Sequence, residues 1–330
     1  MAKKRIAING FGRIGRLTFR NLIKNNDVEV VSINDLTDNH TLAHLLKYDT
    51  MHGQFEGAVS ADDEYLYVNG QKIIGSAIKN PAECPWKELG VDVVLECTGI
   101  FLDREKAGLH LQAGAKRVLL SAPPKADDVP TFVIGANHDK IKDSDLILSN
   151  ASCTTNCLVP MIMTLDQAFG VEQFFMNTIH AYTADQNLQD GPHRDLRRAR
   201  AAAQNIVPTS TGAAKAVVLV APHLKGKIAA HSMRVPVATG SVTDVVATIK
   251  KAATVEEINA AFQTAAETNL KGILEYTSDP IVSGDIVRNK HSCIFDSGLT
   301  QVNGNTCRIV GWYDNEAGYS ARLADMAAML

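Results

Sequence analysis

A glycine-rich turn between a short apolar segment and an amphipathic one is the strongest constraint in this sequence. Residues 5–9 (RIAIN) predict a buried strand, residues 10–15 (GFGRIG) follow at once, and residues 13–24 have the apolar spacing of a helix. A second, β-branched run at 28–33 (VEVVSI) predicts the next strand. Strand, turn, helix and strand form a βαβ unit, which is right-handed in nearly all proteins. The pattern therefore predicts an open, mostly parallel sheet flanked by helices.

The three glycines of this turn have the spacing of a dinucleotide-binding site. Gly10 permits the tight turn, Gly12 lets the backbone approach a pyrophosphate, and Gly15 lets the helix pack closely on the strand. Asp35 follows the second strand, where its carboxylate can accept hydrogen bonds from a ribose and would repel a 2′-phosphate. The pattern predicts an NAD site and favours NAD over NADP. The alternative is a glycine-rich turn that binds nothing, with Asp35 capping the next helix.

The later part of the chain has a different pattern from the first 150 residues. Before that point, the sequence predicts a hairpin at 64–78, turned at Asn69-Gly70, and short strands at 91–97, 117–121, 131–134 and 146–148. After Cys153 the predicted strands are longer and alternate, at 173–183, 227–237 and 241–250. Helices are expected at 39–48, 153–169, 210–221 and 254–268. This arrangement predicts a second, α+β domain whose helices cover one face of its sheet.

The composition is that of an ordinary water-soluble chain of about two domains. The sequence has 330 residues, 45% of them hydrophobic and 21% charged. A formal net charge of -3 argues against a nucleic-acid binder, which needs cations for phosphate contacts. No apolar run approaches the roughly 18–20 residues of a membrane span, and no apolar signal segment follows the first lysines. We therefore expect a cytoplasmic protein whose six cysteines are free.

Two of these cysteines lie four residues apart in the segment 149–158 (SNASCTTNCL). Zinc sites combine such a motif with a second Cys or His pair, and the sequence has no compact second pair, which argues against a metal site. Both thiols could face a core, and this is the preferred interpretation for Cys157. Cys153 differs, because Asn150 or Ser152 can cap the helix that follows and place Cys153 in its first turn. The positive end of a helix favours a thiolate, so Cys153 is a candidate nucleophile with a depressed pKa.

A thiolate nucleophile needs a base or a cation beside it, most often a histidine. His180 ends a strand-like run (FFMNTIHAYT) that follows the helix of Cys153, so a return from helix to strand would bring it to the same end of the sheet. A single histidine in a strand can equally be structural. The pairing of Cys153 with His180 is a hypothesis that depends on this geometry.

Several longer stretches of the sequence match one known family. They are 8–16 (INGFGRIGR), 45–53 (LLKYDTMHG), 149–158 (SNASCTTNCL), 180–186 (HAYTADQ), 197–216 (RRARAAAQNIVPTSTGAAKA), 234–236 (RVP) and 312–320 (WYDNEAGYS). With them the chain resembles phosphorylating, NAD-dependent glyceraldehyde-3-phosphate dehydrogenase from end to end. The resemblance implies a Rossmann-type doubly wound NAD-binding domain over residues 1–151 and a catalytic domain with a mostly antiparallel sheet over 152–315. It also implies a C-terminal helix, 316–330, packed back onto the first domain, and a homotetramer whose interface is crossed by segment 184–207.

The resemblance also implies a reaction. In that family a cysteine thiolate attacks the aldehyde, hydride leaves for NAD, and inorganic phosphate cleaves the resulting thioester. Here Cys153 would be the nucleophile and His180 its base, converting D-glyceraldehyde 3-phosphate, phosphate and NAD to 1,3-bisphosphoglycerate and NADH in glycolysis. By resemblance the pocket for the substrate phosphate has Thr183, Asp185, Arg198 and Arg234. The pocket for the incoming phosphate would have Ser152, Thr154, Thr211 and Gly212, with Arg198 near both.

Further residues would contact the cofactor by the same resemblance. The set is Gly10, Gly12, Arg13, Ile14, Gly15, Asp35, Lys79, Ser121 and Asn315. Lys79 would lie near the adenine, where many relatives have arginine. Gly191 stands where some relatives have leucine, so the preference for NAD would depend mainly on Asp35. By spacing alone, neither Arg13 nor Asn315 carries a signal of cofactor binding.

Two rival functions remain open at this point. An erythrose-4-phosphate dehydrogenase shares the fold, the cysteine and the histidine, but water attacks its thioester. The intact Thr154, Thr211 and Gly212 favour the phosphorylating enzyme. A protein that binds NAD, RNA or a surface without turnover could have lost Cys153 or His180, and the sequence retains both.

Overall fold

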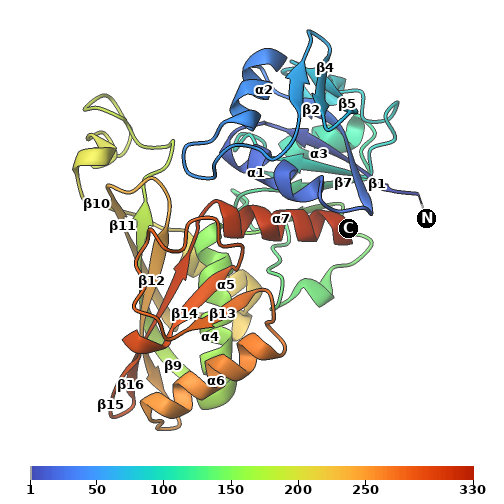
Figure 1. Cartoon of the computed structure of the whole chain (residues 1–330). Coiled ribbons are helices and arrows are strands. Elements are labelled where there is room, and N and C mark those ends of the chain that lie inside the picture. Colours follow the sequence, from blue (N-terminus) through green and yellow to red (C-terminus); the bar gives the residue numbers. More distant parts are fainter. Residues whose placement is uncertain (1) are drawn as a thin grey trace. The chain divides into compact units, whose positions relative to one another are not determined.

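The computed structural model describes residues 2–330, which form two compact units (Figure 1). Unit 1 contains the chain up to Phe132 together with Lys140–Ala151 and Ser320–Leu330. Unit 2 contains Val133–Asp139 and Ser152–Tyr319. Within residues 2–330, no helix combines the length and the apolar character that crossing a membrane requires.

Unit 1 is built on one eight-stranded sheet with the order β3-β4-β5-β2-β1-β6-β7-β8. Its strands are β1 (Lys4–Asn9), β2 (Val28–Asn34), β3 (Val59–Ala61), β4 (Tyr65–Val68), β5 (Gln71–Ser76), β6 (Val93–Glu96), β7 (Arg117–Leu120) and β8 (Ile147–Ser149). Its helices are α1 (Arg13–Leu22), α2 (Asn39–Lys47), α3 (Arg104–Gln112) and the short turn η1 (Pro81–Glu83). From β5 to β8 all neighbours are parallel. This is the doubly wound order of a Rossmann-type sheet, with its switch point between β1 and β6.

The glycine-rich turn between β1 and α1 is possible only because two of its residues lack a Cβ. Gly10 has φ +93°, and a Cβ added there would lie 2.7 Å from the backbone N of Thr98. A Cβ on Gly15 would lie 2.2 Å from the carbonyl oxygen of Gly10. Gly12 differs, since a Cβ there would have no neighbour within 4 Å. Helix α1 therefore starts directly against the end of β1.

Unit 2 contains a second sheet, ordered β10-β11-β9-β12-β16-β14-β13, with β15 paired to β16. The strands are β9 (Val171–Ala181), β10 (Val207–Thr209), β11 (Ile228–Val235), β12 (Ser241–Ile249), β13 (Leu274–Thr277), β14 (Cys293–Asp296), β15 (Gln301–Asn303) and β16 (Thr306–Tyr313). The helices are α4 (Cys153–Phe169), α5 (Ala213–Val220), α6 (Val255–Glu267) and the turns η3 (Ala202–Gln204), η4 (Pro222–Leu224) and η5 (Ser297–Leu299). Figure 1 shows α4, α5 and α6 on one face of this sheet, and α4 contacts β9, β12, β14 and β16. The predicted α+β arrangement is confirmed, since only β9–β11 and β13–β14 pair in parallel.

The last helix, α7 (Ala317–Met329), lies mostly in unit 1, which contains the chain from Ser320 onward. Leu323, Met326 and Ala327 are buried on one face of it, as their spacing predicts. The ammonium group of Lys4 donates to the carbonyl oxygen of Ala328 at 2.8 Å. The C-terminal segment therefore packs beside the start of β1.

Two sequence-based expectations differ from the structure. Residues 131–134 form no strand but a single bridge between Thr131 and Ser149. The chain turns at Val133, whose N–H donates to the side chain of Asn137 at 2.8 Å and whose carbonyl oxygen accepts from the N–H of Ala136, so the ladder cannot continue. The helix expected over 210–221 begins only at Ala213. A further turn, η2 (His138–Lys140), and the helix α3 were not predicted. The hairpin at Asn69-Gly70 is confirmed, with φ angles of 51° and 82° at its turn residues.

The contact between Gly15 and Gly10 leads to a stability prediction. We expect Gly15→Ala to lower the free energy of unfolding by about 1–3 kcal/mol, because its Cβ meets a backbone oxygen that cannot move away easily. Urea unfolding followed by circular dichroism measures this. Gly12→Ala is the matched control and should stay within about 0.5 kcal/mol of the original protein. Equal effects of the two substitutions would contradict the steric argument.

Candidate active site

The thiol of Cys153 and the imidazole of His180 lie together in unit 2. Cys153 is the first residue of α4, and the hydroxyl of Ser152 caps this helix by accepting from the N–H of Thr155 at 3.2 Å. His180 lies near the end of β9, which returns from α4. The Sγ atom of Cys153 is 3.4 Å from Nε2 of His180. The helix start and the strand end thus bring a nucleophile and a base within hydrogen-bonding distance.

The surroundings of His180 determine which ring nitrogen can accept a proton. Its Nδ1 lies 2.7 Å from the carbonyl oxygen of Ala181, which can only accept. Nη1 of Arg234 is also 3.2 Å from Nδ1, but its two hydrogens are directed to the carbonyl oxygen of Ala181 and to Oγ1 of Thr183, so Nδ1 carries the hydrogen. Nε2 is therefore the accepting nitrogen, and it faces Cys153. His180 is 4% exposed, so water does not compete for this position. The pair is arranged for transfer of a proton from sulfur to Nε2.

Burial decides the protonation state of this pair. It raises the pKa of the Cys153 thiol, and Arg234 and hydrogen bonds from Thr154 oppose this without outweighing it. Burial also lowers the pKa of His180 to about 3, and the charge of Arg234 adds to the shift. The sequence-based expectation of a depressed pKa for Cys153 is therefore wrong, because desolvation of the thiolate outweighs the helix start. The pair is held as a thiol and a neutral imidazole, and the base has to remove the proton as the thiol reacts.

Tyr313, at the end of β16, supports both partners and was not singled out in the sequence. Its hydroxyl lies 2.9 Å from Oγ1 of Thr154 and 2.8 Å from Oγ1 of Thr178. Its ring meets the ring of His180 edge-on at 5.9 Å. The residue is 1% exposed, so this contact is part of the core. Only its position in the stretch WYDNEAGYS could have drawn attention to it.

Beside His180, a group of charged and hydroxyl side chains forms one connected cluster. Nη1 of Arg234 donates to Oγ1 of Thr183 at 2.9 Å, and Thr183 in turn donates to the carboxylate of Asp185. Nη1 of Arg198 donates to Asp185 at 2.6 Å, and its Nε donates to Oγ1 of Thr209 at 2.7 Å. Burial would raise the pKa of Asp185, but Thr183 and the two arginines lower it further than burial raises it. Two guanidinium groups and a hydroxyl are thus held in a set typical of phosphate sites.

The residues assigned to the incoming phosphate have more varied surroundings. Thr211 and Gly212 precede α5, where Thr211 accepts from the N–H of Ala213 at 3.2 Å and Gly212 is exposed. A helix start with exposed N–H groups suits an anion. The hydroxyl oxygen of Thr154 lies 2.9 Å from that of Tyr313, and the hydroxyl oxygen of Ser152 lies 2.8 Å from Oγ1 of Thr155.

In unit 1, Asp35 links the end of β2 to the glycine-rich turn. Its carboxylate accepts from the N–H of Phe11 at 2.7 Å and from the N–H of Thr37 at 3.0 Å. The guanidinium group of Arg13 pairs with Asp49 and lies 3.2 Å from Nδ1 of His52. Burial would raise the pKa of Asp49, but His52 and Arg13 hold it well below the ordinary range. At the start of α1, the Arg13 side chain is therefore engaged by an acid.

Three other residues assigned to the cofactor differ in their contacts. Lys79 is exposed, and the N–H of Ser121 donates to the carbonyl oxygen of Glu96 at 3.0 Å. Asn315, in unit 2, is buried, and its amide oxygen accepts from the N–H of Gly240 at 3.1 Å and the hydroxyl of Ser241 at 3.1 Å. This leaves the amide NH₂ of Asn315 as its donor toward another group, which suits a carboxamide.

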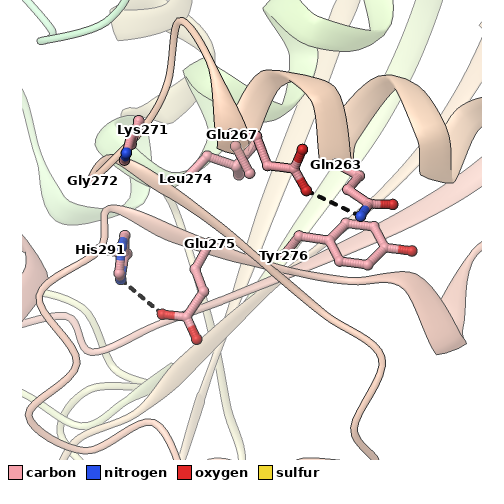
Figure 2. A pocket seen from close by; sticks show the side chains of 9 residues that line it. Gln263, Glu267, Lys271, Gly272, Leu274, Glu275, Tyr276 and His291 are labelled. Carbon is pink, nitrogen blue, oxygen red and sulfur yellow. Dashed lines mark hydrogen bonds and ion pairs between the residues drawn. The ribbon is translucent and has the colours of Figure 1, made fainter.

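Figure 2 shows a separate hollow of about 520 Å³ in unit 2, between α6 and β13. Its polar side chains pair with one another, as in the 2.7 Å contact of Glu275 with His291 and the 3.1 Å bond from Gln263 to Glu267. None of the residues predicted for catalysis or cofactor binding lines it. The chemistry therefore concentrates at Cys153 and not in this hollow.

The chain is similar to known proteins of one family. Residues 4–104 match the model of the NAD binding domain of glyceraldehyde 3-phosphate dehydrogenase, and residues 152–315 match the model of its C-terminal domain. The chain is 57% identical over 333 residues to the glyceraldehyde-3-phosphate dehydrogenase of Mycobacterium avium, covering 99% of this chain and 98% of that protein. It is 56% identical to the glyceraldehyde-3-phosphate dehydrogenase of Mycolicibacterium smegmatis and 53% identical to glyceraldehyde-3-phosphate dehydrogenase 2 of Streptomyces avermitilis. Both alignments also cover 99% of this chain and 98% of the relative. The chain therefore belongs to the glyceraldehyde-3-phosphate dehydrogenase family.

Proposed function

We propose that this protein is the phosphorylating, NAD-dependent dehydrogenase of D-glyceraldehyde 3-phosphate, forming 1,3-bisphosphoglycerate and NADH in glycolysis. The observation that carries the proposal is the 3.4 Å approach of Cys153 Sγ to His180 Nε2 at the start of α4. A thiol with an oriented base is what covalent catalysis on an aldehyde requires. The cluster of Arg198, Arg234 and Thr183 beside this pair suits a phosphorylated substrate.

The chain's own residues supply the proton transfers of this reaction. Nε2 of His180 takes the thiol proton as Cys153 Sγ attacks the aldehyde carbon, and the N–H of Cys153 stabilises the oxyanion that forms. The protonated imidazole returns the proton to this oxygen, giving a hemithioacetal, and removes it again when hydride leaves. Bound NAD supplies the hydride acceptor. The product on the enzyme is a Cys153 thioester. An oxygen of the phosphate attacks its carbonyl carbon, the C–S bond breaks to release the acyl phosphate, and Sγ takes back the proton from His180.

Two phosphate positions follow from the residue types. Thr183, Asp185, Arg198 and Arg234 would hold the phosphate of the substrate, in which Asp185 orients the guanidinium group of Arg198 through the 2.6 Å hydrogen bond. Ser152, Thr154, Thr211 and Gly212 would hold the attacking phosphate, with backbone N–H groups at the start of α5 as further donors beside the exposed Gly212. The rival reaction of erythrose 4-phosphate with water needs no such second position.

The cofactor would be bound by unit 1. We assign residues 1–151 and the C-terminal helix to the NAD-binding domain and 152–315 to the catalytic domain. Gly10, Gly12, Ile14 and Gly15 would lie at the pyrophosphate, where Arg13 contributes its backbone because its side chain pairs with Asp49. Asp35 would bind the adenosine ribose, with Lys79 near the adenine. Ser121 and Asn315 would contact the nicotinamide side.

A homotetramer in the cytoplasm fits the surface and the cysteines. Phe175 (64% exposed) and Val246 (41% exposed) pair across β9 and β12 on the sheet face opposite the helices. Leu188 and Leu196, in segment 184–207, are 80% and 81% exposed. Apolar side chains gathered in this way are typical of contacts between subunits. All six cysteines are free, as expected in a reducing compartment.

The proposed reaction predicts a phosphate requirement. NADH formation from D-glyceraldehyde 3-phosphate should be fast with inorganic phosphate and slow without it, because water is a poor substitute for phosphate on the thioester. Absorbance at 340 nm measures NADH for this aldehyde and for erythrose 4-phosphate. Cys153→Ser should remove oxidation, by at least ~1000-fold, and leave NAD binding largely intact. Turnover retained by this variant, or rates independent of phosphate, would refute the proposal.

The position of Asp35 predicts cofactor preference. Asp35→Gly should raise kcat/KM for NADP relative to NAD by about 10-fold or more, because the carboxylate that would repel a 2′-phosphate is removed. Steady-state kinetics with each cofactor tests this. Asp35→Asn, which keeps an acceptor for the N–H of Phe11, separates the loss of charge from the loss of the turn contact. An unchanged ratio in both variants would count against the assignment.

The buried imidazole of His180 predicts a pH dependence of stability. Its pKa is about 3 in the folded protein and 6.5 in the unfolded chain, so only the unfolded chain takes up the proton below pH 6.5. The stabilisation is therefore present above pH 6.5 and is lost as pH falls toward 3, by about 2 kcal/mol between pH 7 and pH 5. Urea unfolding of the original protein and of His180→Gln at both pH values isolates this contribution. If the free energy of unfolding changed by the same amount between the two pH values in both proteins, the pKa of His180 would not be lowered by folding and the prediction would fail.

A further inference from the structure

A buried carboxylate lies at the switch point of the unit 1 sheet, outside the residues assigned so far. Glu96 ends β6 and Asn9 ends β1, and the two residues pair directly in the sheet. Glu96 is 0% exposed and Asn9 is 2% exposed. The amide NH₂ of Asn9 donates to Oε2 of Glu96 at 2.6 Å. The carboxylate therefore joins the carboxyl ends of the two strands between which Rossmann-type sheets bind their dinucleotide.

The other oxygen of Glu96 holds the segment that faces the glycine-rich turn. Oε1 accepts from the N–H of Thr98 at 2.8 Å and from its hydroxyl. The hydroxyl of Thr98 in turn accepts from the N–H of Ile100 at 3.1 Å, which directs its hydrogen to Glu96. Thr98 is the residue whose backbone N would lie 2.7 Å from a Cβ on Gly10. Glu96 thus holds in place the Thr98 backbone that packs against Gly10.

A histidine with a defined tautomer completes the surroundings of the carboxylate. Nε2 of His110 lies 3.0 Å from Oε2 of Glu96, and the indole N–H of Trp86 donates to Nδ1 of His110 at 3.0 Å. An indole can only donate, so Nδ1 must accept and Nε2 must carry the hydrogen. His110 and Trp86 are both 0% exposed. Asn9, Thr98 and His110 therefore all donate to Glu96.

The network continues from Asn9 to the end of β2 and to the segment that follows β5. The amide NH₂ of Asn34, the last residue of β2, donates to Oδ1 of Asn9 at 2.7 Å. Oδ1 of Asn34 accepts from the N–H of Ile78 at 2.8 Å. Asn34 precedes Asp35, and Ile78 precedes Lys79. The chain of hydrogen bonds therefore reaches the neighbours of both residues assigned to the adenosine half of the cofactor.

We propose that Glu96 is a positioning residue for NAD, holding the ends of β1 and β6 and the Thr98 segment in the arrangement that binds the dinucleotide. The inference rests on the proposed NAD-dependent function of this chain. Burial of a carboxyl group costs free energy unless hydrogen bonds satisfy it, and here both of its oxygens accept from strand ends and loop groups beside the glycine-rich turn. The groups that Glu96 holds belong to the edge of the sheet where the cofactor residues are. Its role is therefore to hold those groups for binding.

Glutamine at position 96 tests this role because the hydrogen-bond donors around it are held in place by other contacts and cannot become acceptors. A carboxamide has one accepting and one donating side, so its NH₂ must face either Thr98 or the pair of Asn9 and His110. The Thr98 N–H is fixed by the backbone, Asn9 is held by Asn34, and His110 is held by Trp86. In either orientation the NH₂ group of the glutamine would face another hydrogen-bond donor, so at least one hydrogen bond would be lost. Glu96→Gln changes neither size nor hydrophobic packing, so its effect reports the carboxylate alone.

The experiment is a calorimetric titration of NAD into the full-length protein, into Glu96→Gln and into Val94→Ala. Val94 lies on the same strand, is 0% exposed, and belongs to the hydrophobic core and not to the network. We expect Glu96→Gln to raise the Kd for NAD at least ~10-fold, with kcat at saturating NAD within about 3-fold. Val94→Ala should lower the thermal midpoint of unfolding but keep the Kd within about 2-fold.

A Kd unchanged in Glu96→Gln, or raised equally in Val94→Ala, would overturn the inference. If Glu96→Gln does not fold, Thr98→Val and Thr98→Ser decide the question. Valine removes the hydroxyl donated to Glu96 and should raise the Kd about 3-fold or more, whereas serine keeps the hydroxyl and should not. Equal Kd values for these two variants would also overturn it. If the original protein itself fails to bind NAD, the proposed function falls, which is a different result from any change caused by the variants.

Discussion

The short distance between the sulfur of Cys153 and Nε2 of His180 depends on how α4 and β9 are joined. Helix α4 begins at Cys153, crosses the face of the unit 2 sheet, and returns through Gly170 into β9, which ends at the level where the helix began. The hydrogen bond from His180 to its neighbouring carbonyl then turns the accepting nitrogen toward the sulfur. A helix and strand of mismatched length would separate the two groups.

Burial sets the chemistry of this pair. A helix start favours a thiolate, yet desolvation raises the pKa of the Cys153 thiol and lowers the pKa of the His180 imidazole. Cys153 and His180 are therefore held as a neutral thiol and a neutral imidazole, with Nε2 of His180 placed to accept the thiol proton. Nearby, Arg198 forms an ion pair with Asp185 and Arg234 donates to Thr183, and all of them partly reach solvent, which suits recognition of an anion.

Much of the fold could be predicted from the sequence, because its signals are local. Glycines at 10, 12 and 15 between strand and helix, the Asn69-Gly70 hairpin and the apolar spacing of α7 each act within a few residues. The single bridge at Thr131 was misjudged because pairing depends on a partner distant in sequence. Tyr313, Glu96 and His110 carry no local pattern, since their importance comes from contacts 14 to 159 residues away.

The sequence by itself determined the βαβ unit at the start of the chain, the helix start at Cys153 and the position of Asp35 after β2, because each follows from periodicity, turn residues and capping within a short segment. Only the tertiary structure decided the protonation of Cys153 and His180, the pairing of Arg13 with Asp49 and the network around Glu96. The reason is physical: a pKa and a hydrogen-bond partner depend on what surrounds a group in space, and folding brings together residues that the chain keeps far apart.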